Sequence, residues 1–171
     1  MALDTPRNLF LHELGKMRDA ERTGSQLLGW LSTKVRNENL AQILRTEKNE
    51  SDQQRANIDA CLRELGGAPL ATTSDIVEGI RIGFEQVANL QPSPEVVDLF
   101  ALITAMKFMH FSIGTYVVLV SWAELTGQPK CRQSLQSNLT CKGEGAGRLE
   151  RVGPELRQKL LVTTTSRQPA R

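Results

Sequence analysis

Residues 10–35 read FLHELGKMRDAERTGSQLLGWLSTKV, and the spacing of apolar side chains in this stretch decides the fold. Steps of four and three residues trace one unbroken series through it: Phe10, Leu14, Met17, Glu21, Gly24, Leu28, Leu31 and Val35. That spacing predicts a helix with one face turned toward a core. One member of the series, Glu21, is a carboxylic acid. Because a buried carboxylate without a partner is costly, Glu21 needs a cationic partner, a metal ion or a proton.

The same spacing returns after a short break at residues 37–39. Its members are Leu40, Leu44, Glu47, Ser51, Gln54, Ile58, Cys61 and Leu65. A Gly66-Gly67 pair with Pro69 just beyond it predicts the end of this second helix. Because so short a break joins two long helices, they are predicted to lie antiparallel.

Two more long helices are predicted in the second half of the chain. The first begins at a Ser93-Pro94 start signal and places on one face Leu99, Ile103, Met106, His110, Ile113, Val117 and Val120. The last helix places on one face Leu135, Leu139, Lys142, Ala146, Leu149 and Leu156, and its glycines predict fraying or a kink at residues 143–147. Between the two pairs, a short helix is predicted with Ile76, Ile80, Phe84 and Val87 on one face.

These elements together predict an all-α fold. The expected architecture is a four-helix bundle of two antiparallel hairpins, joined by a crossover that contains the short helix. The bundle is expected to span residues 1–161. Residues 162–171 have no apolar period, which predicts a disordered tail.

Composition excludes several classes of protein. The formal net charge of the 171 residues is +2, the basic residues are scattered, and only 5% of residues are aromatic, so nucleic-acid binding is not indicated. Cys61, Cys131 and Cys141 are an odd number at unpatterned spacings, which argues against a disulfide framework and a zinc ribbon. The first residues lack the basic and apolar regions of a signal peptide. We expect a cytoplasmic protein.

The stretch of residues 99–123, LFALITAMKFMHFSIGTYVVLVSWA, is long enough to cross a bilayer. However, Lys107 and His110 lie near its middle, where ionisable groups are costly in lipid. A helix that is apolar all round is also typical of the centre of a bundle. We therefore expect a buried helix that also contacts a second subunit, rather than a membrane span.

Polar residues at predicted core positions are the candidate functional residues. They are Glu21, Glu47, His110 and Lys142, with Glu50 at the edge of the same face as Glu47. Carboxylates from two helices and a histidine from a third are the ligand types of a dinuclear metal site inside a bundle. The alternative is that these groups only form hydrogen bonds with one another in the interior.

Four segments resemble the YciE/YciF family of ferritin-like proteins. They are residues 9–14 (LFLHEL), 19–22 (DAER), 62–69 (LRELGGAP) and 110–116 (HFSIGTY), and the resemblance runs from about Asn8 to Leu156. It implies a four-helix ferritin-like bundle with a carboxylate-rich di-metal centre and a stress-associated role. In that comparison Glu21 and Glu50 match family acids, and Glu47 stands where many members have histidine.

The resemblance also implies that this metal centre is degenerate. Met109 and Ser112 stand where the family has glutamates, and Cys141 and Lys142 stand where the last helix has paired acids. Losing acids and gaining a lysine changes the charge balance toward a site without metal. Our hypothesis is that the Lys142 ammonium replaces the metal as counter-charge and pairs with Glu21 and with Glu47 or Glu50.

Two alternatives to that ion pair stay open. Lys142 can instead extend to solvent from a frayed helix. A mononuclear site can also form from Glu21, Glu47, Glu50 and His110, together with Cys141, and those ligand types suit zinc or iron.

The sequence therefore leaves three classes of function. The first is a stress-associated structural or interaction module with no functional di-metal centre, no cofactor and no catalytic residues. It would be a homodimer or higher homo-oligomer, with Trp30 and Trp122 as candidates for the self-association surface. The second is a metal-dependent oxidase or peroxide-handling protein that uses iron or manganese with a reduced ligand set. The third is a membrane-associated bundle.

Overall fold

Five helices make up most of the chain in the computed structural model, which describes residues 3–66 and 73–167. They are α1 (Pro6–Ser32), α2 (Glu38–Glu64), α3 (Asp75–Ala88), α4 (Pro94–Leu125) and α5 (Pro129–Arg167). Neither of the two described ranges contains a β-strand. The all-α class predicted from the sequence is confirmed.

The helix ends follow the local signals in the sequence. The Thr5 hydroxyl oxygen accepts a hydrogen bond from the Asn8 backbone N–H at 3.1 Å, with Pro6 at the first helical position. Gly127, between α4 and α5, has a φ of 69°, a left-handed conformation that favours glycine. Gly66 follows α2 with a φ of 66°. The rest of the predicted stop signal, Gly67 to Pro69, lies outside the described residues.

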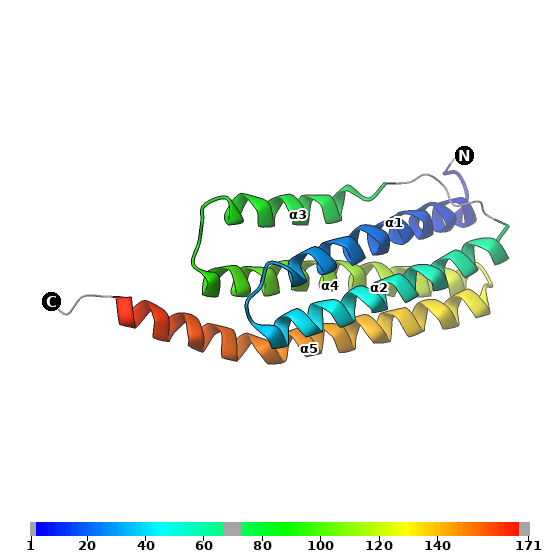
Figure 1. The fold of residues 1–171 in the computed structure, drawn as a ribbon. Helices are drawn as coiled ribbons and strands as arrows, with labels where there is room; N and C mark the ends of the chain where they lie inside the picture. The colour runs from blue at the N-terminus through cyan, green and yellow to red at the C-terminus, as the bar shows by residue number, and fades with distance from the viewer. Residues whose placement is uncertain (1–2, 67–72, 168–171) are drawn as a thin grey trace.

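The four long helices lie side by side in two antiparallel pairs (Figure 1). One pair is α1 and α2, and the other is α4 and α5. In the sequence, α3 connects the two pairs. It packs beside α1 and α4 and returns the chain to the end of the bundle where α4 begins. An edge-to-face contact between Trp30 on α1 and Phe84 on α3, with ring centroids 5.2 Å apart, fixes α3 in place. The Trp30 ring therefore packs against another helix of the same chain.

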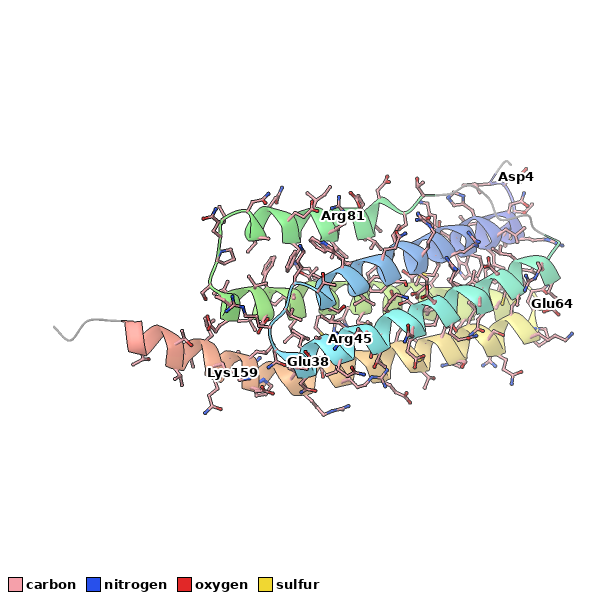
Figure 2. All side chains as sticks on the ribbon, viewed as in Figure 1. Asp4, Glu38, Arg45, Glu64, Arg81 and Lys159 are labelled. Carbon is pink, nitrogen blue, oxygen red and sulfur yellow. The ribbon has the colours of Figure 1, made fainter. Side chains whose placement is uncertain are left out.

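The apolar series predicted for the first two long helices are confirmed as core faces. In α1 every member from Phe10 to Leu31 is buried, and Val35, beyond the helix end, is half-buried. In α2 every member from Leu40 to Cys61 is buried, as is Leu65 directly after the helix. Because these helices are amphipathic, polar residues mark the outer face and the pattern specifies the inner one. Two exposed polar residues of α2, Glu38 and Arg45, are labelled in Figure 2.

The face predicted for α4 is wrong except at Val120, which is buried. Ile103, His110 and Val117 are exposed, and the buried face runs instead through residues that include Phe108, Met109, Ser112, Tyr116 and Leu119. The side chains of α4 are mostly apolar on every face of the helix, so the sequence does not show which face is turned toward the core. Among the described residues, α4 is the one helix long and apolar enough to cross a membrane. It packs along α1, α3 and α5, and 44% of its most apolar window is buried.

The last helix is longer and more regular than predicted. Helix α5 is unbroken from Pro129 to Arg167, so the glycines at residues 143–147 do not fray it. It also continues through residues 162–167, where a disordered tail was expected, and Figure 1 shows this part extending beyond the other helices. The backbone hydrogen bonds of the helix continue through these residues, although the sequence there has no periodic apolar face. Residues 168–171 lie outside the described part of the chain.

Candidate functional site

The interior of the bundle contains an ion pair between α1 and α5. Lys142 donates from Nζ to Oε2 of Glu21 at 2.9 Å, and the two side chains are 1% and 0% exposed. The same Nζ donates to the Ser51 hydroxyl oxygen on α2 at 2.8 Å. The centroid of the Phe108 ring on α4 lies 4.4 Å from Nζ. Lys142 therefore contacts all three other long helices, and a carboxylate and a ring face together compensate its buried charge.

Glu21 is held on its other oxygen by a chain of hydrogen bonds. Tyr116 donates its hydroxyl proton to Oε1 of Glu21 at 2.9 Å. Asn138 donates to the Tyr116 oxygen at 3.1 Å and to the Gln54 carbonyl at 3.2 Å, and Asn57 donates to Asn138 at 2.7 Å. Burial, followed by the negative charge of Glu21, raises the pKa of Tyr116 well above its ordinary value. The phenol stays protonated, so both oxygens of Glu21 have a donor.

A second polar group joins α2 to α5 beside this ion pair. Arg148 donates from Nε to Oε1 of the buried Glu47 at 2.7 Å, and this hydrogen bond raises the pKa of Arg148. Cys141 donates from Sγ to Oε2 of Glu50 at 2.8 Å. Burial, followed by that hydrogen bond, raises the pKa of Cys141 to about 11. The thiol is therefore protonated at neutral pH in this environment.

Helix α4 provides a mostly apolar wall to the polar interior. Phe108 and Met109 are both 0% exposed. The Phe108 ring takes the space that a side chain on Gly24 would need, because a Cβ there would lie 2.0 Å from Cζ of the ring. Ser112 is also fully buried, and its hydroxyl has no hydrogen-bond partner within the described ranges. This wall contributes no carboxylate to the centre.

The structure brings together only some of the site residues predicted from the sequence. Lys142 pairs with Glu21 as expected, but its second partner is Ser51 and neither Glu47 nor Glu50. Those two acids instead contact Arg148 and Cys141 of α5. The expectation that Lys142 extends to solvent is wrong, because the side chain is 1% exposed.

The prediction for His110 is also wrong. This residue is exposed and lines a groove between α4 and α5 together with Met106 and Lys107. Its side chain is therefore on the opposite face of α4 from Phe108 and Ser112. A mononuclear site that includes His110 with Glu21 is excluded by this placement.

Several contributing residues were not identified as site residues from the sequence. Asn138 is one helical turn before Lys142 on the same face, a signal that a search for polar residues at that spacing would find. Ser51 was placed on the inward face of its helix, but a hydroxyl there is common in bundles and indicates no role. Arg148 carried no signal, because a long side chain on a helix is usually solvated.

The residues present do not fit a di-metal centre. Such a centre needs several carboxylate or imidazole ligands that converge on the metal and balance its charge. Within residues 3–66 and 73–167, no group of three or more His, Cys, Asp or Glu side chains is placed to hold a metal ion. Both oxygens of Glu21 already accept hydrogen bonds, from Lys142 and from Tyr116, and the Lys142 ammonium would repel a metal ion placed beside it.

Comparison with known proteins gives one family. A family model described as a domain of unknown function, DUF892, matches residues 5–161. Protein YciF of Escherichia coli strain K12 is 25% identical over 140 residues, which cover 81% of this chain and 84% of YciF. The crystal structure of the E. coli stress protein YciF matches with a TM-score of 0.87 and 23% identity, covering 92% of this chain and 99% of that one.

A second solved structure has the same fold. YcfI of Rhodopseudomonas palustris, provisionally described as a structural protein, matches with a TM-score of 0.82 and 24% identity. The match covers 88% of this chain and 97% of YcfI. Fold and site together define an all-helical bundle with an ion-paired interior. The chain belongs to the DUF892 family, and the resemblance to YciF predicted from the sequence motifs is confirmed.

Proposed function

We propose that this protein is a metal-free, ferritin-like bundle of the YciF type that acts as a structural or interaction module in a stress response. The ferritin-like assignment is supported by two antiparallel helix pairs joined by α3. The stress-associated role is supported by similarity to a protein described as a stress protein in E. coli. We place the protein in the cytoplasm, where its three free cysteines stay reduced.

One observation carries the metal-free part of the proposal. Each of the two fully buried acids has its own cation from α5: Lys142 for Glu21, and Arg148 for Glu47. These two buried carboxylates are thus balanced without an added ion, and a divalent metal would have only the half-buried Glu50 to offset its charge. The remaining acid, Glu50, accepts a hydrogen bond from the Cys141 thiol.

Elemental analysis tests the proposal directly. The protein is purified without a chelator or a polyhistidine tag, and its iron, manganese and zinc contents are measured. We expect far less than one metal ion per chain, including after incubation with each metal and removal of the excess. A stoichiometric content of any of the three would overturn the proposal and support a metal-dependent oxidase or peroxide-handling protein instead.

We further propose that the module is a homodimer that uses the outer face of α4. Val117 and Val118 on this face are 53% and 46% exposed, and Ile103 is 39% exposed. Next to this face, a groove with a volume of about 750 Å³ lies between α4 and α5, and its lining combines apolar residues such as Ile103 and Met106 with polar ones that include His110. Apolar faces of this kind are covered in two-fold dimers, in which each copy contributes the same surface.

A further inference from the structure

Two buried cysteines that are far apart in sequence meet at one end of the bundle. Cys61 is in the last turn of α2, Cys131 is in the first turn of α5, and they are 2% and 1% exposed. Figure 1 shows these two helix ends side by side. The Cys61 thiol points at the first turn of α5, with Sγ 3.9 Å from the carbonyl oxygen of Cys131 across 70 positions of sequence. Both cysteines are free thiols.

Other contacts hold the same two turns together. Lys130, next to Cys131, forms an ion pair with Glu64 at 3.3 Å, one turn beyond Cys61. The interaction between the two neighbouring thiols raises the pKa of Cys61 and lowers the pKa of Cys131. Cys131 is therefore the better nucleophile of the two. Its position at the start of α5, where backbone N–H groups point outward, also favours the thiolate.

We propose that Cys61 and Cys131 form an oxidisable dithiol, which hydrogen peroxide converts into an intramolecular disulfide that ties α2 to α5. In the first step the Cys131 sulfur attacks one peroxide oxygen. An S–O bond forms, the O–O bond breaks, and the departing hydroxide takes a proton to become water. In the second step the Cys61 sulfur attacks the Cys131 sulfur, so the S–S bond forms and the S–O bond breaks, and the departing hydroxide takes the Cys61 proton to become a second water. The two sulfurs are oxidised together by two electrons, and the peroxide is reduced.

The location of the pair makes this reaction possible in a folded protein. Both residues are within one turn of a helix end, where local opening requires less free energy than in the middle of a bundle. A small oxidant reaches the thiols through such openings. The disulfide would close a long loop between positions 61 and 131, and loops of this length give a large gain in stability. We expect the thermal midpoint of the oxidised protein to be about 10 °C higher than that of the reduced protein.

Cys141 provides a matched control in the same chain. Its thiol is hydrogen-bonded to Glu50 and has a pKa of about 11, so it is mostly protonated and poorly nucleophilic at neutral pH. It also lies more than two helical turns along α5 from Cys131, which places it out of reach of the pair. Oxidation is therefore expected to consume two of the three thiols and to spare this one.

The experiment treats the full-length folded protein with hydrogen peroxide at neutral pH, quenches with iodoacetamide, and maps peptides by mass spectrometry without reduction. We expect a peptide that joins Cys61 to Cys131, an alkylated Cys141, and no covalent dimer. The variant Cys141→Ser should form the same link. Cys61→Ser and Cys131→Ser should form no intramolecular link, and the rise in the thermal midpoint should be absent in both.

Three results would overturn the inference: all three thiols remain free, the link includes Cys141, or crosslinks form only between chains. A crosslinked protein with an unchanged or lower thermal midpoint would contradict the proposed tie between α2 and α5. The outcome is independent of the metal analysis, because neither cysteine contacts the ion-paired interior.

Discussion

Gly145 of α5 lies directly against the carboxylate of Glu47 on α2: a Cβ atom at position 145 would be 2.2 Å from Oε2 and 2.8 Å from Cδ. The glycine thus allows α2 and α5 to approach each other while the acid keeps its bond to Arg148. This explains why a helix tolerates glycine here despite its low propensity.

We expect Gly145→Ala to lower the free energy of unfolding by about 1–3 kcal/mol, because the added methyl group displaces the Glu47 carboxylate. Gly143→Ala is the matched control, since position 143 is exposed and no atom lies within 4 Å of a Cβ there. That variant should be more stable by up to about 1 kcal/mol through helix propensity alone. Urea denaturation measures both. Equal effects in the two variants would contradict the close approach of α2 and α5.

We expect Lys142→Ala to lower the free energy of unfolding by about 3–5 kcal/mol, because it leaves the carboxylate of Glu21 buried without its cation. The double variant Lys142→Met with Glu21→Gln removes both charges, retains an acceptor for Tyr116, and should recover most of the loss. Lys159→Ala removes an exposed ion pair and should leave the urea midpoint unchanged.

Metal content is measured on the same Lys142→Ala protein. Loss of the ammonium leaves one oxygen of Glu21 without its partner, so the variant is expected either to unfold at a lower urea concentration or to take up iron or manganese. A variant that unfolds like the wild type and remains metal-free would refute the role of Lys142 as counter-charge.

We expect stability to decrease as the pH rises above 9.0, the ordinary pKa of a cysteine thiol. In the folded protein the pKa of Cys141 is raised to about 11 and that of Tyr116 is raised well above 10.0. A raised pKa stabilises the folded state fully below the unfolded-state value, and that stabilisation is lost as the pH rises through the folded-state value. Cys141→Ser should flatten the curve between pH 9.0 and about 11. Urea midpoints measured across this range provide the test, and a curve unchanged by the substitution would contradict it.

We expect Val117→Lys to convert a dimer into a monomer, because it places a charge in the proposed α4 interface. Ile76→Lys is the matched control, since Ile76 on α3 is 54% exposed and Val117 is 53% exposed. Light scattering coupled to size-exclusion chromatography measures the mass of each. A monomeric wild type, or dissociation in both variants, would count against α4 as the interface.

The sequence predicted the structure well where a helix has one polar and one apolar face, and poorly where all faces of a helix are apolar. In α1 and α2, polar outer faces left one possible inner face, so Glu21 and Glu47 were correctly placed in the core. In α4, apolar residues on every face left more than one possible inner face, and the face that was predicted placed His110 in the core, where the structure does not have it. The pair of Lys142 with Glu21 was predictable because each is a polar residue on an otherwise apolar face. The partner of Glu47 was not, because it depends on the close approach of helices at Gly145.

The Phe108 ring limits which substitutions this fold tolerates. The ring occupies the space beside Gly24 and contacts the Lys142 ammonium, so the lysine, the phenylalanine and the glycine depend on one another. An acid at position 142 alone would face Glu21 with no cation between them. A larger residue at position 24 would collide with the ring. Single substitutions at positions 24 and 142 are therefore expected to give a less stable protein, so these positions are constrained to change together.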